Sequence, residues 1–244
     1  MDETVTGLPR LAIVIPVFNE GANIVSALIG LREKVKSSFT ICIVYDFDGD
    51  DTLPAVRSAE ADLEMRIALV KNKYGRGVLN AIKTGLESAS SEYVIVTMAD
   101  LSDPPEVINA MVEKADAEKA DIVCGSRYMK GGRQVGGPLL KGLMSRGAGL
   151  SLHYLARLAT HDATNSFKLY RKSFLDKVSI ESTGGFELGI ELVVKAHRGG
   201  FKIAEVPSVW TDRVAGKSNF KLMKWLPSYL KWYFMAFTKV RFHG

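Results

Sequence analysis

The sequence predicts an α/β fold built on a mostly parallel, doubly wound sheet. Short continuous apolar runs, typical of strands buried on both faces, alternate with segments whose apolar residues recur at helical spacing. Polar residues directly follow several of these runs, as expected where strands end at the ligand-binding edge of such a sheet. A length of 244 residues suits one large α/β domain or two small ones.

The first half of the chain alternates regularly. The run LAIVIPVF predicts the first strand, and the helical spacing of Ile24, Leu28 and Leu31 predicts the helix after it. The same reasoning gives strands at 11–18, 41–47, 66–70, 93–100 and 121–127. It gives helices at 23–35, 53–63, 75–89 and 105–115. This order indicates parallel strands joined by crossover helices.

The second half is less regular. Residues 128–145 are rich in glycine and basic side chains, so we expect either a mobile loop that closes over a site or a flexible surface connection. Helices are expected at 146–160 and 186–200, and strands at 167–172 and 201–207. Residues 219–237 mix aromatic side chains with lysines around Pro227.

Basic residues are unevenly distributed. The formal net charge is +5, yet no acidic residue lies between Asp121 and Asp162, and none follows Asp212. Two basic segments without acids indicate an anionic partner such as a phosphate or an anionic membrane. A nucleic acid is not expected, because no motif of that class is present.

Membrane contact is expected at the C-terminal end. The N-terminus has no signal pattern and no apolar run reaches the roughly 18 residues of a spanning helix, which favours a cytoplasmic protein. We interpret 1–218 as a catalytic domain. We interpret 219–244 as a basic aromatic segment at the membrane interface, with a core-packing helix as the alternative.

Carboxylates at two predicted strand ends are candidates for chemistry. Asp100 ends the fourth strand, where its oxygens suit a hard cation such as Mg²⁺ or Mn²⁺. Asp103 stands before two prolines, a position that favours helix capping. Asp46 ends the second strand and could accept hydrogen bonds from a base or ribose. Its neighbours Asp48, Asp50 and Asp51 are typical of turns and caps.

Nine segments in order resemble the dolichyl-phosphate mannosyltransferases and related polyprenyl-phosphate glycosyltransferases. They cover roughly residues 11 to 225 and comprise PVFNEGANI (16–24), VYDFDGDDT (44–52), NKYGRGVLNAIKTG (72–85), MADLSDPPE (98–106), GSRY (125–128), SRGAG (145–149), NSFKLYRK (165–172), GFELGIELVVKAHRGGFKIAEVP (185–207) and DRVAGKS (212–218). The resemblance implies a Rossmann-like, GT-A type nucleotide-sugar-binding fold and sugar transfer with inversion. It implies a mannose or glucose-like sugar, a lipid phosphate acceptor and a divalent cation.

The resemblance also implies residue roles. Pro16, Phe18, Glu20, Val44 and Asp46 match segments that hold the nucleoside. Asp100 and Ser102 match metal ligands, Arg127 and Arg146 match residues that hold the lipid phosphate, and Arg213 and Lys217 match a basic pair near the donor diphosphate. From the residues themselves, Arg76 is placed to touch donor phosphates at a helix N-terminus, with a packing turn as the alternative.

A lipid phosphate is already ionised at pH 7, so it needs arginines to position it and no general base. Relatives often continue into transmembrane helices; this chain is therefore expected to bind a membrane peripherally or through a small membrane protein subunit, unless it is part of a longer chain.

Two positions depart from the family pattern. Tyr45 and Met98 each stand where the family has an aspartate, so one carboxylate is missing near the expected base and one near the expected metal. Asp103 could compensate if its turn allows. Three alternatives therefore stay open: a donor other than GDP-mannose, a saccharide hydroxyl as acceptor, and a non-catalytic nucleotide-sugar-binding paralogue.

Overall fold

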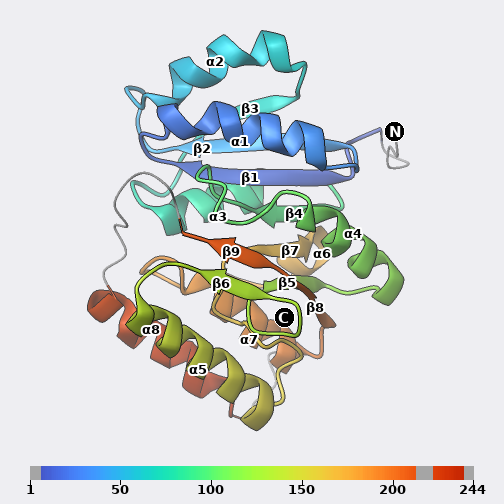
Figure 1. Ribbon diagram of the computed structural model, residues 1–244, viewed down its shortest axis with the longest axis vertical. Coiled ribbons are helices and arrows are strands. Elements are labelled where there is room, and N and C mark those ends of the chain that lie inside the picture. Colours follow the sequence, from blue (N-terminus) through green and yellow to red (C-terminus); the bar gives the residue numbers. More distant parts are fainter. Residues whose placement is uncertain (1–6, 213–221, 239–244) are drawn as a thin grey trace.

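A computed structural model describes residues 7–212 and 222–238. A seven-stranded sheet with the order β3-β2-β1-β4-β7-β5-β8 forms the centre of the molecule, with helices on both faces (Figure 1). Its strands are β1 (Leu11–Val17), β2 (Phe39–Tyr45), β3 (Ile67–Lys71), β4 (Tyr93–Val96), β5 (Ile122–Ser126), β7 (Lys168–Arg171) and β8 (Ile203–Pro207). Only β7 runs antiparallel to its two neighbours, β4 and β5. The predicted mostly parallel sheet is confirmed.

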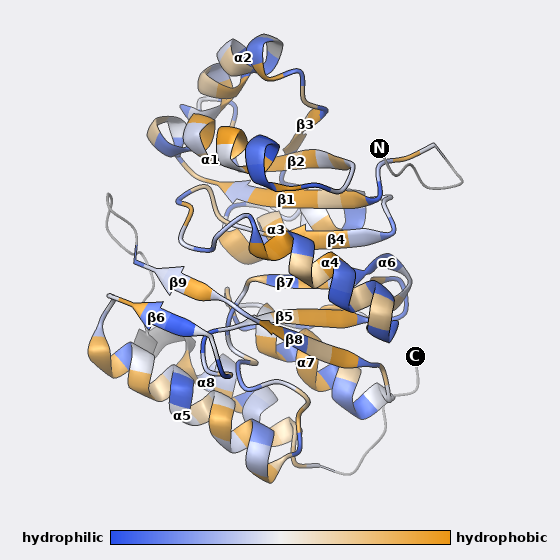
Figure 2. Cartoon of the chain, turned by 45° about the vertical axis from the view of Figure 1, so that its right-hand side comes forward, coloured by the Kyte–Doolittle hydropathy of each residue, from blue (hydrophilic) through white to orange (hydrophobic). Residues whose placement is uncertain are grey.

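Helices cover the sheet because its central strands are apolar on both faces. The helices are α1 (Gly21–Lys34), α2 (Thr52–Leu63), α3 (Val78–Ser88), α4 (Val107–Glu118), α5 (Leu139–Leu155), α6 (Lys172–Leu175), α7 (Leu188–Gly199) and α8 (Leu222–Met235). In β1, Leu11 and Ile13 pack in the cluster that holds α1, α2 and α4, while Val14 packs in the cluster that holds α3 and α7. Most of β1 has the hydrophobic colour in Figure 2, in agreement with this burial on both faces.

The glycine-rich segment differs from its prediction. Residues 128–145 contain β6 (Arg133–Val135), which pairs in parallel with β9 (Val209–Thr211), and the first turns of α5. Gly136 and Gly137 have φ values of 78° and 79°, a conformation that L side chains rarely adopt. Glycines that the sequence analysis interpreted as a sign of mobility are thus required by a defined turn ahead of α5.

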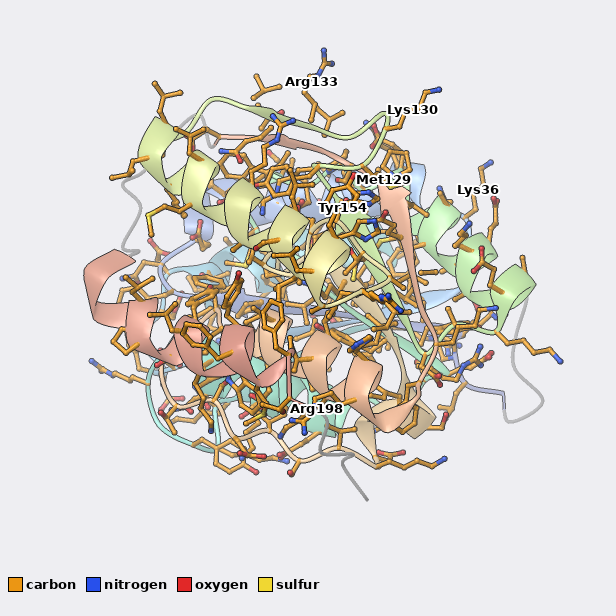
Figure 3. All side chains as sticks on the ribbon, turned by 90° about the horizontal axis from the view of Figure 1, so that it is seen from below. Lys36, Met129, Lys130, Arg133, Tyr154 and Arg198 are labelled. Atoms are coloured by element: carbon orange, nitrogen blue, oxygen red, sulfur yellow. The ribbon has the colours of Figure 1, made fainter. Side chains whose placement is uncertain are left out.

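The described part of the C-terminal segment packs on the domain. Helix α8 lies against α7 and α5, and the three helices lie side by side in the view from below (Figure 3). Trp232 is 1% exposed within the core, and the Tyr233 hydroxyl is 3.0 Å from the Ser151 hydroxyl. Interfacial placement is therefore wrong for Trp232, whereas Phe234 and Phe237 are exposed. Within 7–212 and 222–238, no helix is long and apolar enough to cross a membrane.

Candidate active site

A cavity of about 1040 Å³ opens at the carboxyl ends of the parallel strands. The segments after β1, β2, β4 and β5 contribute polar side chains to it, and α5 and α8 form its opposite wall. Eight of the residues singled out from the sequence line this one cavity: Pro16, Phe18, Glu20, Asp46, Arg76, Asp100, Ser102 and Arg127. Residues up to 111 positions apart in the sequence, from 16 to 127, thus line the same cavity, as their places at strand ends predict.

Val44 and Arg146, two further predicted site residues, do not line the cavity. Val44 is fully buried, and its side chain packs against α3 at Gly85, so this side chain does not reach the cavity. Arg146 is exposed on α5 and is not among the lining residues, although its neighbours Ser145 and Gly147 are. Arg213 and Lys217 lie outside the described residues.

An aromatic and basic wall lies at the end of the cavity formed by the segments after β1 and β2 and the loop before α3. The Phe18 and Phe47 rings have centroids 5.8 Å apart, and the Arg76 guanidinium lies 5.0 Å from the Phe47 ring centroid. Phe18 is exposed towards the cavity, which leaves a π face for a base to stack on. Phe47 follows Asp46 in the predicted turn, but the sequence analysis gave it no role.

Asp46 fixes the loop that leads into α3. Its two carboxylate oxygens accept hydrogen bonds from the Gly77 backbone N–H (2.9 Å) and the Asn72 side-chain amide (2.8 Å). The adjacent Tyr45 packs against the core cluster of α1 and α2 and does not line the cavity. The loss of an aspartate at position 45 therefore removes no carboxylate from the cavity wall as it stands.

The other acids of the turn after β2 form local structure, as predicted. Asp50 is buried and accepts hydrogen bonds from the Asn19 backbone and from the backbone and hydroxyl of Thr52. Asp51 accepts from the Gly21 backbone at 2.9 Å, at the first residue of α1. These bonds join the turns after β1 and β2 and hold that rim of the cavity.

A second acidic segment follows β4. Asp100 accepts a hydrogen bond from the Ser102 backbone (3.1 Å), and both residues line the cavity together with Met98 and Asp103. The capping interpretation of Asp103 is wrong, because α4 begins at Val107 and its N-cap position is Glu106. Two prolines separate Asp103 from that position, and prolines offer no N–H to cap.

The side chain of Asp103 is buried, which disfavours its charged form. The residue is 5% exposed, and its Oδ1 atom has no hydrogen-bond partner among the described groups. Burial raises the pKa of Asp103 to about 7, while the charge of Arg127 and a hydrogen bond from Asn165 oppose that rise. Burial thus disfavours the charged form of Asp103, and one of its two oxygens has no donor among the described groups.

The residues here fit a divalent cation. No three His, Cys, Asp or Glu side chains gather as a metal cluster in the described ranges. Mg²⁺ does not require that, since it is commonly held by one or two carboxylates together with substrate phosphates. Asp100 and the Ser102 hydroxyl supply hard oxygen donors, and the uncompensated oxygen of Asp103 is what an absent cation would leave behind.

Arg127 lies at the end of β5 in a buried ion pair. Its Nε and Nη2 atoms donate to the two oxygens of Asp162 at 2.7 and 3.0 Å, and Nη2 also donates to the Ser145 hydroxyl at 3.0 Å. Burial alone would raise the pKa of Asp162, but the charge and hydrogen bonds of Arg127 outweigh it and lower that pKa. The pair joins β5, α5 and the loop before β7.

Sequence reasoning missed several residues of this site. Asp162, Thr164 and Asn165 reach it from the loop before β7, and Lys141 and Trp210 line the cavity from α5 and β9. Asp162 is the first acidic residue after the basic segment that follows Asp121. This position could have indicated it as the partner of an arginine in that segment. Trp210 had no such signal, because it depends on the pairing of β9 with β6.

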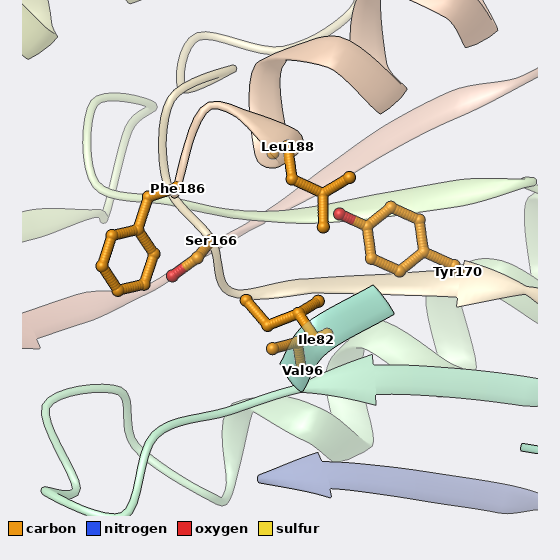
Figure 4. Close-up of a pocket in the computed structure, with 7 residues that line it drawn as sticks. Ile82, Val96, Ser166, Tyr170, Phe186 and Leu188 are labelled. Carbon is orange, nitrogen blue, oxygen red and sulfur yellow. The ribbon is translucent and has the colours of Figure 1, made fainter. Parts of the chain in front are cut away.

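A much smaller cavity of about 10 Å³ adjoins the main one, and Figure 4 shows the residues that line it. Ser166 and Phe186 border both cavities, and the rest of the small one is lined by Ile82, Val96, Tyr170, Leu188 and Gly189. Its volume is about that of a single water molecule. Of these two cavities, only the large one has room for an organic ligand.

The model of the family described as glycosyl transferase family 2 matches residues 12–179, more than half of the chain. The chain belongs to glycosyl transferase family 2. The matched region of this family 2 member runs from β1 through β7 and so contains Asp46, Asp100 and Arg127.

Two curated relatives are similar over most of the chain. A dolichol-phosphate mannosyltransferase of Pyrococcus furiosus is 27% identical over 219 residues, which are 87% of this chain and 59% of the relative. A polyprenol monophosphomannose synthase of Mycolicibacterium smegmatis is 29% identical over 239 residues, which are 91% of this chain and 89% of the relative. The chain thus spans well under two thirds of the Pyrococcus protein.

Two solved glycosyltransferase structures share the fold. A glucosyl-3-phosphoglycerate synthase from Mycobacterium tuberculosis, in complex with Mn²⁺, UDP-glucose and phosphoglyceric acid, superposes with a TM-score of 0.69 at 16% identity, covering 93% of this chain and 79% of that one. A mannosyltransferase from Pyrobaculum calidifontis, in complex with GDP-Man and Mn²⁺, gives 0.61 at 17% identity, covering 86% and 59%. These similarities confirm the GT-A type fold.

Proposed function

We propose that the protein transfers a mannose or glucose-like sugar from a nucleotide diphosphate sugar to a polyprenyl or dolichyl phosphate, with inversion. The observation that carries this proposal is the make-up of the cavity of about 1040 Å³. It joins an aromatic and acidic end, suited to a nucleotide and a cation, to Arg127 and then to an apolar end between α5 and α8. The names of the Pyrococcus and Mycolicibacterium relatives support a lipid phosphate as the acceptor.

The donor occupies the acidic end in this proposal. Phe18 stacks the base, and Asp100 with the Ser102 hydroxyl would hold Mg²⁺ or Mn²⁺ against the diphosphate. When bound, the cation supplies charge neutralisation for the nucleoside diphosphate leaving group. Arg76, at the loop ahead of α3, adds a positive charge on the same side. Arg213 and Lys217 keep their proposed place near the diphosphate.

The acceptor phosphate binds beside Arg127. Asp162 orients the guanidinium through Nε and Nη2, and Nη1 makes no hydrogen bond that the described residues reveal. Lys141 lines the cavity from α5 and offers a second positive charge. Arg146 lies on the same helix and would have to turn inward to share the phosphate. An ionised phosphate attacks the anomeric carbon without a general base, so none is assigned.

The apolar end suits the isoprenoid part of the acceptor. Gly147 and Ala148 of α5 face Leu226, Leu230 and Tyr233 of α8 across the cavity. Small residues on one helix opposite large apolar residues on the other leave a groove between them. Ligand sites of this kind are mostly apolar, with a few polar groups that fix orientation.

The outer face of α5 supports peripheral binding at the cytoplasmic face of a membrane, with or without a small membrane protein subunit. Leu139 and Leu143 are 85% and 69% exposed, and Leu140 beside them is also exposed. Lys130 and Arg133 extend outward next to this helix (Figure 3). Exposed leucines flanked by basic residues are typical of helices that insert into an anionic interface.

We expect the double substitution Leu139→Asp, Leu143→Asp to weaken binding to vesicles that contain anionic lipid by at least about tenfold, because each buried leucine contributes roughly 1.5–3 kcal/mol. Co-sedimentation with vesicles measures this. Ile29→Asp, which changes an exposed isoleucine on α1, is the matched control and should bind as the unchanged protein does. Equal binding by the double variant would place the membrane contact elsewhere.

Incubation with polyprenyl phosphate, Mn²⁺ or Mg²⁺ and a panel of nucleotide sugars tests the proposed reaction. We expect a glycolipid, detected by mass spectrometry, with GDP-mannose among the accepted donors. Transfer to a soluble hydroxyl acceptor and not to the lipid would overturn the acceptor assignment. Nucleotide binding without transfer from any donor would favour the non-catalytic paralogue.

A further inference from the structure

The segment after β4 contains a buried carboxylate that the proposed reaction does not use. Asp103 is 5% exposed, lines the same cavity as Asp100, and has an Oδ1 atom without a hydrogen-bond partner among the described groups. Buried polar atoms in native proteins nearly always have a partner, so an orphaned one points to an ion or water that completes the site. Leaving one oxygen of a buried carboxyl group without a donor costs free energy.

No element of the fold accounts for Asp103. It does not cap α4, which begins four residues later at Val107, and its two following residues are prolines. No ion pair within 4.0 Å joins it to a cation of the described chain, since Arg127 directs its Nε and Nη2 atoms to Asp162. The Asn165 side chain donates a hydrogen bond to the Asp103 carboxyl, but this leaves Oδ1 without a donor among the described groups.

The surrounding charges favour a cation. Asp100 and Asp162 both act on Asp103 as negative charges, and Arg127 opposes them. The buried ammonium of Lys168 also acts on Asp103 and Asp162. Three carboxylates therefore face two cations, which leaves one negative charge in excess. Met98 also lines the cavity, but its thioether is a soft ligand that Mg²⁺ does not choose.

We propose that Asp103 is a ligand of a divalent cation, and that Asp103 and Asp100 together hold it before any nucleotide binds. Asp103 then supplies the carboxylate that Met98 lacks. This inference shares with the proposed function the cation in the cavity and its ligand Asp100. It requires no particular sugar or acceptor.

A titration of the whole chain with Mn²⁺ in the absence of nucleotide tests the proposal. Electron paramagnetic resonance measures the concentration of unbound Mn²⁺ at each step. We expect Asp103→Asn to raise the Kd for Mn²⁺ by at least about tenfold, since even outer partners of metal ligands contribute about 10–100-fold. Asp48→Asn, which changes an exposed carboxylate paired with Lys71, is the control for binding to surface acids and should leave the Kd unchanged. The double variant Met98→Asp, Asp103→Asn should recover most of the affinity.

Two results would overturn the proposal. One is an unchanged Kd for Mn²⁺ in Asp103→Asn, with thermal unfolding showing that this variant is folded. The other is a protein that binds no Mn²⁺ above the level of the surface sites. Failure of the proposed function looks different: Mn²⁺ binding would still depend on Asp103, while no nucleotide sugar would yield a glycolipid.

Discussion

Replacing Arg127 by alanine is expected to lower the free energy of unfolding by about 3–5 kcal/mol, the usual cost of removing one partner of a buried ion pair. The side chain of Arg127 is 11% exposed and that of Asp162 is fully buried, so the remaining carboxylate would stay without its main partner. Because the pair lowers the pKa of Asp162, its contribution should be present above about pH 4 and lost as the pH falls further. Denaturant unfolding at pH 7 and pH 3 measures both effects.

A second variant separates stability from function at this position. Arg127→Met combined with Asp162→Asn removes both charges and keeps side chains of similar size, so most of the stability should return. Sugar transfer to a lipid phosphate should not return, since the guanidinium would still be absent. A single Arg127→Ala variant as stable as the unchanged protein would show that the ion pair is not a structural element. Recovery of transfer in the double variant would remove Arg127 from the acceptor site.

Sequence patterns predicted the first half of the fold because each element there is determined locally. The run 11–18 is buried on both faces of the sheet, so it had to be apolar throughout, and Asp46 and Asp100 follow strands whose ends meet at one edge. A few consecutive residues are enough to predict each of these elements. The prediction therefore does not require knowledge of which strands become neighbours.

The rest of the site depends on contacts between distant segments. Strand β7 pairs antiparallel with β4 and β5, and this pairing brings Asp162 within reach of Arg127, 35 positions away. The role of Asp103 likewise follows from its burial beside Arg127, whereas its sequence neighbours indicated a cap. Glycines at 136 and 137 were interpreted as flexible, because sequence alone does not distinguish a required positive φ from mobility.

Asp100→Asn is expected to lower kcat/KM for sugar transfer by about 10²- to 10³-fold, the range found when one group that stabilises the charge of a transition state is removed. In the proposed reaction Asp100 acts through the cation that neutralises the leaving diphosphate. Its effect should therefore appear mainly in kcat, with a smaller change in the KM for the lipid phosphate. Steady-state kinetics over a range of Mn²⁺ concentrations measures this.

The same titration distinguishes Asp100 as a ligand from Asp100 as a structural residue. Asp100 lines the cavity, and its hydrogen bond from the Ser102 backbone is one that an asparagine oxygen can also accept. The local turn should therefore persist in Asp100→Asn, and excess Mn²⁺ should restore part of the lost activity. Asp48→Asn again serves as the control, because it changes an exposed acid outside the cavity. A loss of activity that no concentration of Mn²⁺ relieves, in a variant with unchanged Mn²⁺ affinity, would mean that Asp100 acts on the substrate directly and that the cation is held by other groups.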